Sequence, residues 1–229
     1  MTRETFDREL RTLTEKILRL GNVVEEDILR VAQALKARDL RVSREMIEAD
    51  EWVNSQRIEI MMGCFTLIAT QQPTGPDMRA LAAAVEIAGE LERIHDYVKG
   101  IGKISLKLDE ARLPEQVAEM ILPMAEITSQ MLHQALDAYA TNNAMTAHEI
   151  PARDDEVDDF YQQISFALAV SVMEDRAKYE QANLLQWAVH NLERAADRVI
   201  NICEWTVYKA VGKYVELDSE FEAPATLSA

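Results

Sequence analysis

Pairs of acidic residues four positions apart are the part of this sequence best suited to chemistry. The stretch LERIHDYVKGI carries Glu92 and Asp96, and LERAADRVINI, 101 positions later, carries Glu193 and Asp197. Side chains four apart in a helix point to the same face, and two like charges at that spacing repel each other. A cation bound between them would turn the repulsion into an attraction. The repeated pair therefore marks a candidate cation site in each half of the chain.

A second polar pair precedes each of these motifs. Asp50 and Asn54 stand four apart in the first half, and Asp154 and Asp158 have the same spacing in the second. On a helix that turns by about 100° per residue, Asp50 and Asn54 fall within the apolar stripe, and the second pair aligns with apolar residues in the same way. A buried carboxylate is costly unless it is paired or titrates to neutrality. These residues therefore require partners.

Two explanations of the acidic pairs stay open. Arg93 and Arg194 are near them in sequence and could pair with them, and acidic residues on a helix flank are often simply solvated. Alternatively, facing helices that carry Asp and Glu pairs supply four oxygen ligands, a set suited to Mg²⁺, Mn²⁺, Fe or Ca²⁺. The repetition of the pairs in both halves favours a metal.

His95 raises a different possibility, because Glu92 and His95 form a Glu-x-x-His unit of the kind found in di-iron carboxylate bundles. That fold needs two such units, and the position equivalent to His95 in the second half is Ala196. A metal-dependent oxidoreductase is kept as an alternative. The sequence holds no glycine-rich phosphate loop and no nucleophile elbow, so we expect a protein that is not an enzyme.

Composition and charge narrow the class of protein. Lys and Arg number 24 against 40 Asp and Glu, which gives a net charge of −16 and disfavours binding to nucleic acid or anionic lipid. No apolar run is long enough to span a membrane, and residues 1–20 are charged throughout, so we expect a cytoplasmic protein with no direct membrane insertion. Cys64 and Cys203 stand in apolar helical patterns, which predicts buried, reduced thiols.

The pattern of apolar residues predicts an all-α protein. Only seven Gly and six Pro interrupt it, and apolar side chains recur every three or four residues, as in antiparallel helical bundles. We predict six long helices in two tandem three-helix bundles related by the internal repeat. The first bundle spans 1–109, the second spans 110–215, and 216–229 form a tail expected to be disordered. The helices are expected at roughly 6–35, 41–70, 77–108, 114–141, 146–175 and 177–214.

Five segments of the sequence resemble one known family. FDREL, IEADEWVN, GELERIHDYVKGI, RDDEVDDFYQQ and NLERAADRVINI are each similar to segments of the PhoU family, the accessory regulators of bacterial phosphate-specific transport. The resemblance covers residues 3–214. It implies a fold of two similar three-helix bundles, in agreement with the internal repeat.

The resemblance also implies metal binding, because family members hold clusters of iron, zinc, magnesium or manganese through motifs of this kind. Carried over to this chain, the first site would use Asp50, Glu92 and Asp96. Asn54 stands where the family has an acidic residue. It could still bind a metal through its carbonyl oxygen, but the first site would then carry one negative charge fewer. His95 stands where glycine is common, and it could add a nitrogen ligand. The second site would use Asp154, Asp158, Glu193 and Asp197.

In function, the resemblance implies a negative regulator of phosphate uptake and of the transcriptional response to phosphate starvation. Such a protein is an adaptor between the ATPase subunit of a phosphate ABC transporter and a membrane sensor histidine kinase, and it is often a homodimer. The role needs no catalysis. Two alternatives stay open beside it, namely the metal-dependent oxidoreductase and a metal-free helical scaffold that acts on another transporter.

Overall fold

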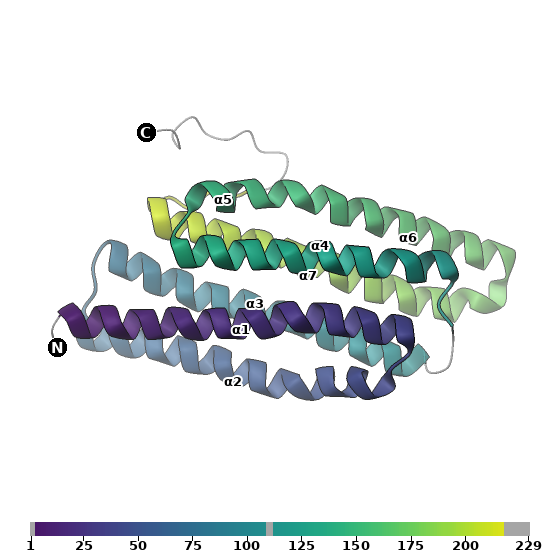
Figure 1. Ribbon diagram of the computed structural model, residues 1–229, viewed down its shortest axis with the longest axis horizontal. Coiled ribbons are helices and arrows are strands. Elements are labelled where there is room, and N and C mark those ends of the chain that lie inside the picture. Colours follow the sequence, from purple (N-terminus) through teal and green to yellow (C-terminus); the bar gives the residue numbers. More distant parts are fainter. Residues whose placement is uncertain (1–2, 109–111, 218–229) are drawn as a thin grey trace.

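The computed structural model describes residues 3–108 and 112–217, and every element within these ranges is helical (Figure 1). The predicted all-α class is therefore confirmed. The predicted boundary at 109 and 110 and tail residues 218–229 lie outside the described residues. No helix within the described ranges combines the length and the apolar character needed to cross a bilayer. In chain order, with η for a 3₁₀ turn, the elements are α1 (Arg3–Ala37), α2 (Leu40–Gln71), α3 (Pro76–Leu108), α4 (Glu115–Thr141), α5 (Ala144–Glu149), η1 (Ile150–Arg153), α6 (Asp154–Glu174), η2 (Arg176–Lys178) and α7 (Tyr179–Val211).

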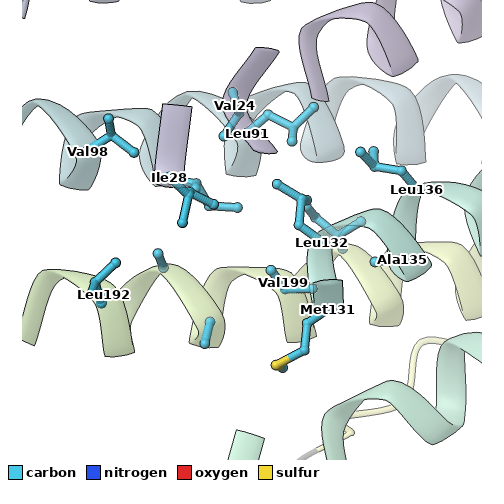
Figure 2. Close-up of a cluster of buried hydrophobic side chains, with 14 of the residues drawn as sticks. Val24, Ile28, Leu91, Val98, Met131, Leu132, Ala135, Leu136, Leu192 and Val199 are labelled. Carbon is cyan, nitrogen blue, oxygen red and sulfur yellow. The ribbon is translucent and has the colours of Figure 1, made fainter. Parts of the chain in front are cut away.

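The helices form two antiparallel bundles that pack against each other (Figure 1). Helices α1, α2 and α3 contact one another in the first bundle, and α4, α6 and α7 do so in the second. Between the bundles, α3 packs on α7 and α1 packs on α4, and the buried apolar side chains of both form one continuous core. Figure 2 shows part of this core, with Val24 and Leu91 from the first bundle and Leu132 and Val199 from the second. Burial of apolar surface therefore joins the two repeats.

Polar contacts also fix the register of α3 against α7. The guanidinium of Arg194 lies over the ring of Tyr97, 4.8 Å from its centroid. Asn191 approaches Gly100 so closely that a Cβ on the glycine would meet Asn191 Nδ2 at 2.7 Å. These contacts hold the two LER motifs on neighbouring antiparallel helices, where each motif can also face its own bundle.

The single long helix predicted at 146–175 is wrong, because the structure divides this segment into α5, η1 and α6. Pro151 has no N–H to donate, and its ring would clash with the carbonyl four residues before it, so the chain makes a 3₁₀ turn there. Helix α6 consequently begins at Asp154. A predicted site carboxylate thus lies in the first turn of a helix, where the helix dipole favours a negative charge.

The C-terminal end of α7 is held by a buried glutamate. The helix ends at Val211 rather than near the predicted residue 214, because Gly212 takes a left-handed φ of 82° that closes it. The chain then returns to Glu204, whose Oε2 accepts from the Tyr214 hydroxyl (2.7 Å) and whose Oε1 accepts from the backbone N–H of Leu217 (2.9 Å). The packed segment therefore extends two residues beyond the predicted boundary at 215.

The two cysteines are buried and free, as predicted. Neither Cys64 nor Cys203 exposes any surface. Burial raises the pKa of the Cys64 thiol to about 11, so it stays protonated at neutral pH. Both thiols are therefore part of the hydrophobic core.

The first bundle depends on close packing at Gly102 of α3. A Cβ at this position would meet the backbone oxygen of Ser43 in α2 at 2.9 Å. Next to this contact, the Ser43 hydroxyl donates a buried hydrogen bond of 2.9 Å to Ser105 Oγ. The close approach sets the distance between α2 and α3, which carry the first set of predicted site residues.

We expect Gly102→Ala to destabilise the protein by about 1–3 kcal/mol, because the added methyl group forces α2 away from α3. Gly89→Ala, in the same helix, is the matched control, since nothing lies within 4 Å of the position its Cβ would take. Alanine should stabilise the helix there by about 0.5–1 kcal/mol. Chemical denaturation followed by circular dichroism measures both changes. Equal stability of the two variants would contradict the role given to Gly102.

Candidate functional site

The first set of predicted site residues lies between α2 and α3, around Asp50. This side chain is buried, with 6% of the residue exposed. Its Oδ2 accepts hydrogen bonds from Lys99 Nζ (2.5 Å) and Asn54 Nδ2 (3.2 Å), and its Oδ1 lies 3.4 Å from His95 Nδ1. Burial alone would raise the pKa of Asp50, but Lys99 and His95 outweigh it and hold that pKa below its usual range. Both oxygens of Asp50 therefore have partners.

His95 connects Asp50 to the first helix. Its side chain is fully buried, and its Nε2 lies 3.4 Å from Asp27 Oδ2 while its Nδ1 faces Asp50. On the other side, Arg30 Nη1 donates to Asp27 Oδ1 at 3.1 Å. A chain of charged and polar side chains from Arg30 to Lys99 therefore links the three helices of the first bundle.

Glu92 and Asp96 lie at the edge of this network. Asp96 Oδ1 is 3.5 Å from Lys99 Nζ, and 49% of the Asp96 side chain is exposed. Burial raises the pKa of Glu92, the charge of Asp96 adds to the effect, and the charge of Arg57 opposes it. Lys99 thus contacts Asp50 and Asp96 of the first set, and the charge of Arg57 acts on Glu92.

The second set lies where α6 and α7 face each other. Asp154 and Asp158 occupy the first turns of α6, and Glu193 and Asp197 lie on α7. Burial raises the pKa of all four carboxyl groups, and repulsion from neighbouring carboxylates adds to it, while the charges of Arg198 at Asp197 and of Arg194 at Asp197 and Glu193 oppose it only in part. The effect is largest at Asp154, where burial and the charges of Asp197, Asp158 and Glu193 raise the pKa to about 7. The second set therefore carries negative charge that is poorly compensated.

The two sets differ because two partners of Asp50 in the first set have no counterpart in the repeat. Within the two LER motifs, Lys99 corresponds to Ile200 and His95 corresponds to Ala196. Across the described ranges, no lysine or arginine nitrogen lies within ion-pair distance of the four carboxylates of the second set. Arg198 directly follows Asp197 in α7, and its charge opposes the rise in the pKa of that carboxyl, but its Nη1 lies 3.6 Å from an oxygen of Glu90 in the first bundle.

Two oxygens of the second set are buried without a hydrogen-bond partner among the described residues. They are Asp154 Oδ1 and Glu193 Oε2. His190 Nδ1 lies 3.1 Å from Glu193 Oε2, but the geometry is not that of a hydrogen bond. A buried acceptor without a donor costs free energy, and a bound cation would remove that cost.

These contacts test how well each set suits a metal. The second set offers unpaired, anionic oxygens, the ligand type of hard divalent and trivalent cations, whereas both oxygens of Asp50 in the first set are already engaged. In the side-chain arrangement of the described residues, no three His, Cys, Asp or Glu groups converge on one metal position. The predicted ligands therefore stay a prediction, favoured by the contacts at the second set; they are Asp50, Asn54, Glu92, Asp96, Asp154, Asp158, Glu193 and Asp197, with His95 as a further nitrogen ligand.

The alternative that arginines pair with the acidic motifs is not supported by the contacts. Arg93 Nη1 lies 3.9 Å from an oxygen of Glu90, and Arg194 lies over Tyr97. In the described part of the chain, neither arginine is within ion-pair distance of a predicted site carboxylate. The cation that pairs in the first set is Lys99 instead.

Sequence reasoning missed three partners of the predicted residues, namely Asp27, Lys99 and His190. Lys99 follows Asp96 by three residues and His190 precedes Glu193 by three, a spacing that brings helical side chains together. These two could have been found. Asp27 offers no such signal, because its partner His95 lies on a different helix.

The repeat that carries both sets matches a known domain. The family model described as the PhoU domain matches residues 17–105 and 121–206. The chain belongs to the PhoU family. The two matched segments fall on α1–α3 and α4–α7, so the internal repeat is a repeat of this domain and the family resemblance is confirmed.

The similarity to individual PhoU proteins runs along nearly the whole chain. The phosphate-specific transport system accessory protein PhoU homolog of Clostridium acetobutylicum is 33% identical over 95% of this chain and 100% of its own length. The homolog of Caulobacter vibrioides is 32% identical over 96% of this chain and 94% of its own length. Among solved structures, PhoU of Streptococcus pneumoniae matches with a TM-score of 0.84 at 30% identity over 92% of this chain and 99% of that one. PhoU of Pseudomonas aeruginosa matches with a TM-score of 0.85 at 26% identity, over 91% of this chain and 100% of that one.

We expect Asp154→Asn to stabilise the metal-free protein at about pH 8 and to stabilise it less than half as much at about pH 5. The pKa of Asp154 rises from its usual 3.8 to about 7 on folding. The folded state therefore binds the proton more tightly, and its stability falls as the pH rises through that range. Asparagine cannot ionise and avoids the loss, which after solvent screening is about 1 kcal/mol, or about 2–4 °C in Tm.

Thermal denaturation in the presence of a chelator measures this difference at the two pH values. Asp155→Asn is the matched control, because Asp155 is exposed and stands beside Asp154 in the same first turn. An equal gain from both substitutions would show that total charge, and not burial of Asp154, is responsible.

Proposed function

We propose that this member of the PhoU family is a regulatory accessory protein of phosphate transport, which represses phosphate uptake and the phosphate-starvation response when phosphate is sufficient. The proposal is carried by the end-to-end match to proteins named phosphate-specific transport system accessory protein, in which both halves of the repeat are present. A match along the whole of both chains supports a shared role of the whole molecule.

In this role the protein is a cytoplasmic adaptor, a homodimer, between the transporter ATPase subunit and a membrane sensor histidine kinase. The continuous core supports the proposal, because it makes the two bundles a scaffold on which two surfaces keep a fixed separation. Each bundle leaves large apolar side chains exposed on its outer helix, with Met62 53% exposed on α2 and Phe166 72% exposed on α6. Exposed apolar side chains favour contact with other proteins.

As a further part of this proposal, the second acidic set binds a metal ion. We place a divalent or trivalent ion, from among iron, zinc, manganese and magnesium, at Asp154, Asp158, Glu193 and Asp197. When bound, the ion supplies the positive charge that these carboxylates lack and ties α6 to α7. Such an ion is structural or regulatory and implies no catalysis. Oxidoreductase chemistry at the Glu92 and His95 unit is disfavoured, because the ring nitrogens of His95 face Asp27 and Asp50.

Removal of the gene from its own organism tests the proposed function. In phosphate-rich medium, a reporter driven by a starvation-induced promoter should switch on after deletion and switch off when the full chain is restored, because the repressing signal is lost and regained. Tagged full chain should capture a phosphate transporter ATPase and a histidine kinase from solubilised membranes. Capture of an unrelated transporter would favour the scaffold alternative, and an unchanged reporter would contradict the proposal.

A further inference from the structure

Lys99 occupies the place in the first bundle where a cation would have to bind. Its Nζ lies 2.5 Å from Asp50 Oδ2 on α2 and 3.5 Å from Asp96 Oδ1 on its own helix. Only 25% of its side chain is exposed. The ammonium group thus bridges the same two elements, α2 and α3, that the predicted metal would bridge.

The remaining contacts around Asp50 close the site further. Asn54 Nδ2 donates to the oxygen that also accepts from Lys99, and His95 Nδ1 faces the other oxygen. The charge of Arg57 acts on Glu92, the other acidic residue of the set. A divalent ion bound here would have to displace these groups and lie close to an ammonium charge, which would repel it.

The second bundle carries the corresponding acidic residues, with Asp158 in place of Asn54, and has no lysine at the position of Lys99. Ile200 and Ala196 take the positions of Lys99 and His95. Oxygens of Asp154 and Glu193 there are buried without a hydrogen-bond donor in the described part of the chain. Of the differences between the repeats, the lysine side chain is the one that places a permanent positive charge among the paired acidic residues.

We infer that the ammonium of Lys99 takes the place of a metal ion in the first acidic set, so that this chain binds external metal at one set where its repeated motifs predict two. The number of metal-binding sets in this inference, one, rests on the proposed function, in which the second set binds a metal. In the first bundle the positive charge belongs to the chain itself, so the first set needs no metal from solution. Only the second set responds to the supply of metal.

The test is a comparison of Mn²⁺ binding by tag-free full chains, measured by equilibrium dialysis and metal analysis. In the wild type, bound Mn²⁺ should be lost on Glu193→Gln and unaffected by Asp50→Asn. Lys99→Met should gain Mn²⁺ beyond the wild-type level, and adding Asp50→Asn should remove the gain. Lys103→Met is the matched control, because the substitution removes the same charge from α3. Lys103 is exposed and lies one helical turn after Lys99.

Thermal denaturation provides a second readout that does not depend on counting ions. Without metal, Lys99→Met should lower Tm, since it leaves Asp50 buried without its main partner. Mn²⁺ should raise the Tm of this variant more than that of the wild type or of Lys103→Met. Circular dichroism at low temperature confirms that each variant is folded before binding is compared.

The outcomes separate the two proposals. Loss of wild-type Mn²⁺ on Asp50→Asn would overturn the inference, because it would place a metal beside Lys99. A Lys99→Met variant that gains neither Mn²⁺ nor metal-dependent stability would overturn it as well. A wild type that binds no Mn²⁺, together with a Lys99→Met variant that does, would refute metal binding by the second set and leave the role of Lys99 intact.

Discussion

Packing of α3 against α7, together with α1 against α4, is the constraint on which the rest of the structure depends. Each of these inner helices packs against its own bundle on one face and against the other bundle on another face. Their buried residues form one continuous core. Little of their surface remains for polar side chains. The acidic residues of each LER motif therefore face the outer helix of their own bundle, α2 or α6, and meet a second polar pair there. The duplicated acidic sets follow from the duplicated packing.

A charge held between packed helices has to be compensated, and the two repeats do this differently. In the first bundle, Lys99 and His95 of α3 reach Asp50 of α2, and His95 reaches on to Asp27 of α1. The carboxylates of the second bundle have no comparable partner, so burial and mutual repulsion raise their pKa values instead. Repeats of one domain therefore provide one electrostatically closed set and one open set within a single continuous scaffold.

This asymmetry is compatible with the proposed role of an adaptor between two partners. In the first bundle, Asp50 is held by Lys99 and His95, so the compensation of this buried charge needs no cation from solution. An open set between α6 and α7 can couple the packing of these helices to a bound cation or to protons. Because the two bundles share one core, a cation bound in the second bundle would act on helices that pack directly against the first.

The sequence by itself determined the helical class, the repeat, the buried cysteines and the acidic positions, because helical periodicity and spacing are local properties that the chain displays directly. It also contained the signal that divides the fifth predicted helix, since Pro151 cannot continue an α-helix. Only the tertiary structure decided which acidic residue has a partner. Asp27, Asp50 and His95 come from three helices, and their contacts depend on how closely α2 approaches α3 at Gly102. Periodicity says which face a side chain occupies, but the distance across a helical interface is set by packing, and that distance decides whether a buried carboxylate meets a cation of the chain, as Asp50 meets Lys99.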